Sequence, residues 1–143
     1  NLEMADIVRG SSEDFEILFR QHDADTVYRS QIAFYTKKFI YTRSADPVEV
    51  RGDGGFSKQY PVLPTETVST IGAGDNFNAG FIYGLIKNGI TRQHIDQGLT
   101  ESQWDALVSS ALDFSAECCR DIYNYVSEEY GEKMRKGLQD NSL

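Results

Sequence analysis

The sequence predicts an α/β fold, and three observations support that prediction. Two apolar segments, residues 4–8 and 37–43, are typical of strands, and a helix start stands between them. After Thr70 the apolar residues change to the three- and four-residue spacing of helices. A glycine-rich turn, Gly72–Gly74, marks that change. Strands and helices that alternate in this way are typical of α/β architecture.

The first half of the chain is expected to hold the strands. A serine N-cap followed by two acids, within Ser11–Asp14, begins a helix after the first strand. Turn signals at Ala45–Pro47 and Gly52–Gly55 separate the later strands, and Pro61 and Pro64 end the last one. We therefore expect strands over residues 4–8, 37–43, 48–51 and 57–63, with a short helix within residues 22–35.

The segment after the glycine turn predicts a helix. Phe77, Phe81 and Leu85 are spaced four residues apart, which places them on one helical face. Gly89 stands where a glycine commonly ends a helix.

A second long helix is expected from Thr100. Thr100 and Gln103 match a capping box. An apolar stripe then runs from Trp104 to Val126 at helical steps, and Gly137–Leu143 is expected to fray.

Composition excludes several classes of function. The 143 residues include 14 basic and 22 acidic side chains, so the net charge is −8 and nucleic acid is excluded as the main partner. No apolar run approaches the roughly 20 residues of a membrane helix, and the acidic start predicts no signal peptide. Cys118 and Cys119 are adjacent and predict two reduced thiols, which favours a cytoplasmic protein.

The glycine turn holds the residue types that bind phosphate. Gly72, Ala73 and Gly74 precede a helix whose first amides lack an intrahelical acceptor and carry partial positive charge. They can therefore form an anion hole. Asp75 would repel an anion there, so it either stabilises the helix start or acts as a base towards a hydroxyl that attacks a phosphoryl group. The turn is neither a Walker A loop nor a GxGxxG dinucleotide loop.

The longer string from Ser69 to Phe81, STIGAGDNFNAGF, resembles the signature of the ribokinase-like, PfkB-type carbohydrate kinases, roughly DTxGAGDxFxAGF. The resemblance implies that Asp75 is the catalytic base, which takes the proton of a substrate hydroxyl as it attacks the γ-phosphate of ATP. It also implies that the amides of Gly72, Ala73 and Gly74 form the anion hole. Asn78 is expected either to contact phosphate or to cap locally.

Two further stretches fit the same family in order. Residues 5–14 resemble the strand that leads to the family's NxxE motif, with Ser11 and Asp14 in the asparagine and glutamate positions. The resemblance implies magnesium binding for Asp14, and first-turn stabilisation is the structural alternative. Residues 40–47 resemble the TxGxxG nucleotide loop, in which Thr42 matches and Ser44 and Pro47 replace glycines. For Thr42, an ordinary β-branched strand residue is the structural alternative.

The resemblance implies the C-terminal part of a ribokinase-like three-layer α/β/α fold. Residues 1–143 are expected to form a single domain, the nucleotide-binding half of a larger kinase, with Thr42, Ser44, Thr70 and Asn78 at the nucleotide. ATP and Mg²⁺ are the implied cofactors. Ser69 replaces an aspartate that often contributes to a monovalent-cation site, so the need for such a cation is left open.

The implied substrate is a sugar or a sugar acid. A kinase of a nucleoside or a vitamin precursor, and a non-catalytic nucleotide-binding or interaction module on the same fold, are the alternatives. Because part of the family's sheet has no counterpart in this chain, we expect a bare sheet edge and self-association, for example as a dimer.

Overall fold

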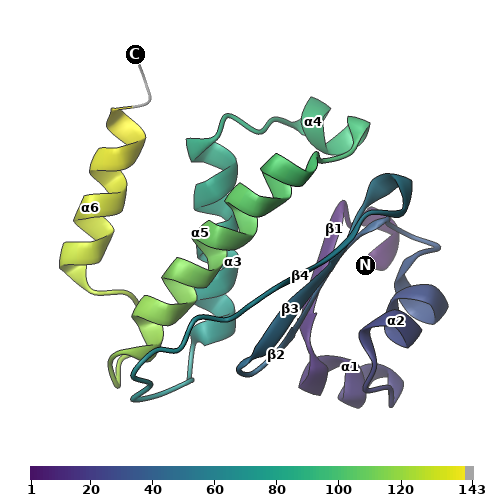
Figure 1. Cartoon of the computed structure of the whole chain (residues 1–143), viewed down its shortest axis with the longest axis horizontal. Coiled ribbons are helices and arrows are strands. Elements are labelled where there is room, and N and C mark those ends of the chain that lie inside the picture. The colour runs from purple at the N-terminus through teal and green to yellow at the C-terminus, as the bar shows by residue number, and fades with distance from the viewer. Residues whose placement is uncertain (141–143) are drawn as a thin grey trace. The chain divides into compact units, whose positions relative to one another are not determined.

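The computed structural model describes residues 1–140, and the chain divides into two compact units, Asn1–Leu63 and Pro64–Leu143. Figure 1 shows the elements of both units in chain order. The prediction of a fraying end at residues 141–143 lies outside the described residues.

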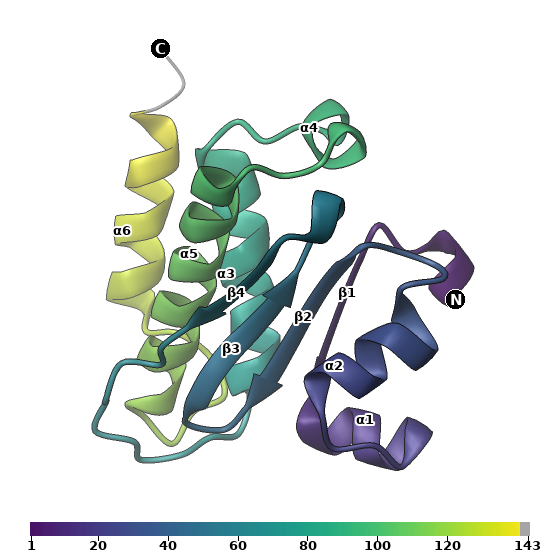
Figure 2. The same cartoon turned by 45° about the vertical axis from the view of Figure 1, so that its right-hand side comes forward.

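The first unit is built on a mixed four-stranded sheet in the order β1-β2-β3-β4 (Figure 2). Its strands are β1 (Ile7–Ser11), β2 (Lys38–Arg43), β3 (Asp46–Arg51) and β4 (Ser57–Tyr60). β1 runs parallel to β2, and the other pairs are antiparallel. The parallel pair requires a crossover, which the helices between β1 and β2 provide.

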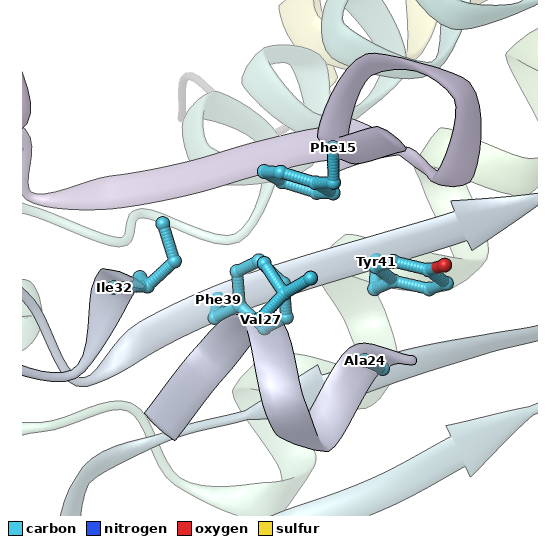
Figure 3. Packing of buried hydrophobic residues seen from close by; sticks show 6 residues of the cluster. All are labelled: Phe15, Ala24, Val27, Ile32, Phe39 and Tyr41. Atoms are coloured by element: carbon cyan, nitrogen blue, oxygen red, sulfur yellow. The ribbon is translucent and has the colours of Figure 1, made fainter. Parts of the chain in front are cut away.

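Helices of that crossover cover one face of β1 and β2. They are α1 (Ser12–Phe19), α2 (Ala24–Val27) and a π-helical turn, η2 (Tyr28–Ile32). Figure 3 shows the buried side chains between helices and sheet: Phe15, Ala24, Val27, Ile32, Phe39 and Tyr41. The Phe15 ring lies 5.4 Å from the Phe39 ring and 5.7 Å from the Tyr41 ring, centroid to centroid. Aromatic packing therefore fixes α1 on the parallel strands.

Three predicted boundaries in this unit are wrong. Residues 2–4 form a 3₁₀ turn, η1 (Leu2–Met4), and the strand predicted over 4–8 occupies Ile7–Ser11, because its pairing with β2 extends to Ser11 opposite Thr42. The turn predicted at Ala45–Pro47 lies at Ser44 and Ala45, so Asp46 already pairs with Arg43. The strand predicted over 57–63 ends at Tyr60. The turn predicted at Gly52–Gly55 before it is confirmed, and it contains a second 3₁₀ turn, η3 (Asp53–Gly55).

The second unit is helical. It contains α3 (Ala73–Lys87), α4 (Arg92–Gln97), α5 (Glu101–Cys119) and α6 (Glu128–Gln139). α3 and α5 pack closely at Gly80, where an added Cβ would lie 2.5 Å from the Ser110 carbonyl oxygen. Trp104, Leu107 and Val108 of α5 are fully buried. None of the helices within residues 1–140 is both long and apolar enough to cross a membrane.

The predicted helix signals of this unit are confirmed. Thr100 and Gln103 form a capping box, with bonds of 2.9 and 3.2 Å. Gly89 adopts a left-handed φ of 61° after α3. Its amide donates to the Ile86 carbonyl oxygen, and the Ile90 amide donates to the Leu85 carbonyl oxygen. This is the Schellman arrangement that favours glycine.

The end of α5 differs from its prediction. The helix stops at Cys119, and Ile122 is exposed, although the apolar stripe continues to Val126. The amides of Val68 and Ser69 donate to the Cys119 carbonyl oxygen, so a distant segment satisfies the helix end. α6 had no counterpart among the predictions. Residues 137–139 belong to it and do not fray.

Candidate functional site

The glycine turn is strained for any residue other than glycine. Gly72, the N-cap of α3, adopts φ 81° and ψ −4°, a left-handed conformation that side chains disfavour. An added Cβ would also lie 2.9 Å from the Asn124 carbonyl oxygen. Glycine is therefore required at this position by its own torsion and by its neighbour.

Free amides remain at the start of α3. The Ala73 amide donates to the Thr70 carbonyl oxygen (3.2 Å), and the Asn76 amide donates to the Gly72 carbonyl oxygen (3.0 Å). Between them, the amides of Gly74 and Asp75 donate to no backbone carbonyl of residues 1–140. Together with the helix dipole, they can receive an anion. The assignment of Gly72, Ala73 and Gly74 to an anion hole stays a prediction, and the Ala73 amide is already engaged.

Asp75 lies in the first turn of α3 with its side chain exposed. A carboxylate in this position can accept a proton from a hydroxyl that approaches the free amides. Its charge also acts inside the unit. Burial raises the pKa of the Cys118 thiol, and Cys119 and the Asp75 carboxylate raise it further.

Asn76 is a site residue that the sequence did not predict. Its side-chain amide is buried and donates to three acceptors: the carbonyl oxygens of Gly72 (2.9 Å) and Asn124 (3.1 Å) and the Cys118 sulfur (3.2 Å). The one signal in the sequence that could have pointed to Asn76 was an amide side chain standing between Asp75 and the apolar Phe77. That position is variable in the family signature, so the resemblance gave no role to it.

The neighbouring predicted residues lie at the same helix start. Thr70 and Asn78 have exposed side chains, and the Thr70 carbonyl oxygen takes part in the turn. The Ser69 hydroxyl accepts a hydrogen bond from the Ile71 amide (3.2 Å). The structure thus brings together Thr70, the glycines, Asp75 and Asn78.

The other predicted residues gather in the first unit, at the carboxyl ends of the parallel strands. Ser11 and Thr42 are register partners at the ends of β1 and β2. The Thr42 hydroxyl accepts from the Arg9 guanidinium (3.0 Å) and donates to the Gly10 carbonyl oxygen (3.4 Å). Ligands of open α/β sheets commonly bind at these strand ends.

Ser44 adopts a left-handed φ of 42° in the hairpin that follows Thr42. It is the first central residue of a two-residue hairpin loop, where glycine is the favoured residue. The glycine expected from the family pattern therefore has a conformational reason, and serine adopts the same conformation here.

Asp14 forms a capping box at the start of α1. Its Oδ2 accepts from the Ser11 amide and hydroxyl, both at 2.8 Å. These two bonds, followed by the charge of Arg9, hold the pKa of Asp14 below its usual value. No group of three or more potential metal-ligating side chains occurs within the described residues. A single ionised carboxylate still fits Mg²⁺, which usually keeps several waters and takes its other ligands from substrate phosphates.

Two surface hollows are lined by other residues. One is lined by Pro64, Thr65, Glu66, Val68 and Arg120. The other lies beside the β2–β3 hairpin and is lined by Tyr41, Arg43, Asp46, Pro47, Glu49 and Gln59. The glycine turn lines neither hollow.

Comparison with known proteins identifies the family. The family model described as pfkB family carbohydrate kinase matches residues 1–114. The chain belongs to the pfkB family of carbohydrate kinases. The match includes both the glycine turn and the strand ends with Thr42 and Asp14, and it confirms the resemblance seen in the signature from Ser69 to Phe81.

Curated relatives of this pfkB chain act on different substrates according to their names. Adenosine kinase 2 of Arabidopsis thaliana is 35% identical over 96 residues, which cover 57% of this chain and 28% of the relative. The 5-dehydro-2-deoxygluconokinase of Geobacillus thermodenitrificans is 28% identical over 88 residues, which cover 59% of this chain and 26% of the relative. The chain therefore spans about a quarter of the length of these relatives.

Solved structures show the fold of the pfkB chain. Aminoimidazole riboside kinase from Salmonella enterica matches with a TM-score of 0.72 at 18% identity, over 96% of this chain and 43% of that one. A fructokinase from Vibrio cholerae matches with a TM-score of 0.71 at 17% identity, over 86% of this chain and 37% of that one. The ribokinase-like α/β fold is confirmed, as a partial domain.

Proposed function

We propose that this chain is the ATP-binding and base-bearing part of a kinase that phosphorylates a hydroxyl group of a sugar or sugar acid. The observation that carries the proposal is the start of α3, where an exposed Asp75 stands beside free amides after a left-handed Gly72. In the proposed protein, residues 1–143 act as one nucleotide-binding domain. Its reduced cysteines, Cys118 and Cys119, support a cytoplasmic location.

In the proposed reaction, the amides at the glycine turn hold the γ-phosphate of ATP. Asp75 orients the substrate hydroxyl and takes its proton. The hydroxyl oxygen forms a bond to phosphorus while the bond from phosphorus to the β–γ bridging oxygen breaks, which releases ADP. Because the transition state of phosphoryl transfer is loose, positioning contributes more than early proton removal.

The remaining residues are proposed to contact the nucleotide. They are Thr42, Ser44, Thr70 and Asn78. Asp14 would hold Mg²⁺ through its ionised carboxylate, and the bound ion would offset the charge of the phosphates.

A nucleoside is the second candidate substrate. It is favoured by the adenosine kinases of Arabidopsis thaliana and Saccharomyces cerevisiae, which are 35% and 40% identical over 96 and 76 residues. A panel of sugars, sugar acids and nucleosides separates the two candidates. Absence of product across the panel would support a non-catalytic nucleotide-binding module instead.

The decisive variant is Asp75→Asn in the native protein. We expect turnover to fall by at least about a thousandfold, the order attributed to a catalytic acid or base together with its positioning, while Mg·ATP affinity is kept. Glu101→Gln is the matched control, because it also removes a first-turn acid from a helix, α5. If Asp75→Asn turns over like the control, Asp75 only stabilises the helix start.

We also propose that the isolated chain self-associates. Ile82 and Ile86 of α3 are 56% and 62% exposed, and Ile17 and Leu18 of α1 are exposed as well. β1 has a neighbouring strand on one side only within the described sheet. Exposed apolar residues and an open edge favour association. Light scattering tests this proposal, and a monomer at all concentrations would contradict it.

A further inference from the structure

Asn76 joins three parts of the second unit that are distant in sequence. Its amide nitrogen donates to the glycine turn at Gly72, to the end of α5 at Cys118, and to the following segment at Asn124. Asn76 is 9% exposed, so water has little access to these bonds, least of all to the bond with the Cys118 sulfur. Loss of the side-chain amide would remove its bonds to the Cys118 sulfur and the Asn124 carbonyl oxygen, whereas the Gly72 carbonyl oxygen would still accept from the Asn76 backbone amide.

Two further contacts join the glycine turn, the end of α5 and the segment after α5, a meeting point that we call the junction. The amides of Val68 and Ser69 donate to the Cys119 carbonyl oxygen, which ties the segment before the turn to the end of α5. Gly72 approaches Asn124 so closely that a Cβ would lie 2.9 Å from its carbonyl oxygen. The glycine turn therefore rests directly on the segment after α5, and Asn76 is the side chain that bonds to both.

We propose that Asn76 is a positioning residue, whose side-chain amide holds the glycine turn against the segment after α5 and so keeps the amides of Gly74 and Asp75 directed at a phosphate. The part about phosphate rests on the proposed kinase function. The part about the turn rests only on the three hydrogen bonds. The two parts are tested separately.

Asn88 offers a matched control on the same helix. Its side-chain amide donates to the Gly84 carbonyl oxygen four residues earlier (2.8 Å), just as Asn76 donates to Gly72. Asn88 stands at the opposite end of α3, as its C-cap. Asn76→Ala and Asn88→Ala therefore each remove a side-chain bond to the carbonyl oxygen four residues earlier. Only Asn76→Ala also removes the bonds to α5 and to Asn124.

The first measurement is the reaction of Cys118 with Ellman's reagent in a Cys119→Ser background, with no nucleotide present. Cys118 is fully buried, so its reaction reports opening of the junction. We expect Asn76→Ala to accelerate this reaction by about tenfold or more, which corresponds to about 1.4 kcal/mol of easier opening. Asn88→Ala should react like the parent. Equal rates in Asn76→Ala and the parent would overturn the proposal.

A third variant separates the local bond from the bonds to the distant segment. A threonine hydroxyl in a helix can donate to the carbonyl four residues earlier, so Asn76→Thr can keep the bond to Gly72. The hydroxyl has only one hydrogen to donate, so it cannot make all three hydrogen bonds of the Asn76 amide. We expect fast Cys118 reaction in Asn76→Thr as well, and parent-like protection would contradict a role for the bond to Asn124. Since this substitution is mild, it also serves if Asn76→Ala does not fold.

Calorimetric titration of Mg·ATP then tests the phosphate part. We expect Asn76→Ala to bind Mg·ATP about tenfold more weakly than Asn88→Ala, measured at the same interval below the melting temperature of each variant. Equal affinities in the two variants would overturn the phosphate part alone. If the parent binds no Mg·ATP, the proposed function fails, and the thiol measurement still decides whether Asn76 holds the turn.

Discussion

The Asp14 carboxylate accepts two hydrogen bonds from Ser11, one from its amide and one from its hydroxyl, and both are 2.8 Å long. The Ser11 hydroxyl also accepts from the Asp14 amide (3.1 Å). Because Ser11 is at once the last residue of β1 and the N-cap of α1, these bonds fix the direction in which the helix leaves the sheet. Asp14 is thus held at the strand end where a magnesium role is proposed for it.

Removing this cap should destabilise the first unit. Ser11→Ala is expected to lower the free energy of unfolding by about 1 kcal/mol, the usual loss for an N-cap serine. Urea denaturation followed by circular dichroism measures it. Ser12→Ala, one residue further inside α1, is the control, and a loss of equal size there would contradict the capping role.

Acid should weaken the same cap. The pKa of Asp14 is lowered in the folded state, chiefly by the Ser11 amide. An acid with a lowered folded pKa contributes stability above its unfolded pKa of about 4, and that contribution is lost as the pH falls through the folded value. Asp14→Asn should therefore show a smaller loss of unfolding free energy than the parent below pH of about 4. If the unfolding free energies of Asp14→Asn and the parent fall in parallel with pH, the hydrogen bonds from Ser11 do not stabilise the ionised Asp14 carboxylate in the folded state.

The contact between α3 and α5 should not tolerate a methyl group at Gly80. In Gly80→Ala the new Cβ would lie 2.5 Å from the Ser110 carbonyl oxygen and 2.8 Å from the Ala111 Cα. Backbone atoms cannot move aside easily, so we expect a loss of about 1–3 kcal/mol in unfolding free energy. In Gly131→Ala the new Cβ would meet no atom within 4 Å other than the adjoining backbone of its own helix and its chain neighbours, and α6 should gain up to about 1 kcal/mol. Thermal denaturation of both variants tests whether Gly80→Ala lowers the stability while Gly131→Ala raises it.

A valine at Gly74 should block the phosphate. The amide of Gly74 is free at the start of α3, and a branched side chain there would stand in the approach to it. In calorimetry, Gly74→Val should lose Mg·ATP affinity by more than about tenfold. Ala79→Val, an exposed position on the same helix, should keep it. Unchanged affinity in Gly74→Val would place the phosphate elsewhere.

Alkali should loosen the packing of α6. Tyr130 packs edge-on against Phe114 of α5, with ring centroids 5.3 Å apart. Burial, and then Asp113 and Glu117, raise the pKa of Tyr130 to about 12. Since an unfolded tyrosine ionises near pH of about 10, stability should fall as the pH rises from that value towards the folded pKa.

Tyr130→Phe should reduce this alkaline loss of unfolding free energy. It should not abolish it, because burial raises the pKa of Tyr28 in the first unit as well. Denaturation at neutral and alkaline pH measures the effect. An alkaline loss as large in Tyr130→Phe as in the parent would contradict the assignment to Tyr130.

Local signals in the sequence were sufficient for much of the second unit. The capping box of Thr100 and Gln103 and the terminal glycine Gly89 act through bonds within a few residues, so their patterns predicted the structure correctly. The end of α5 depends on distant residues. The stripe continues to Val126, but the Cys119 carbonyl oxygen is satisfied by amides at Val68 and Ser69. No pattern within the helix contains that information.

The sequence by itself determined the family, the glycine turn and the place of Asp75 in the first turn of a helix, because those features depend on short-range backbone chemistry. Tertiary structure decided where β1 lies, since its register follows from pairing with β2. It also decided the role of Asn76, which is defined by acceptors 42 and 48 residues away in the chain. A buried amide takes its function from the partners that folding brings to it, and the pattern around Asn76 could not name them.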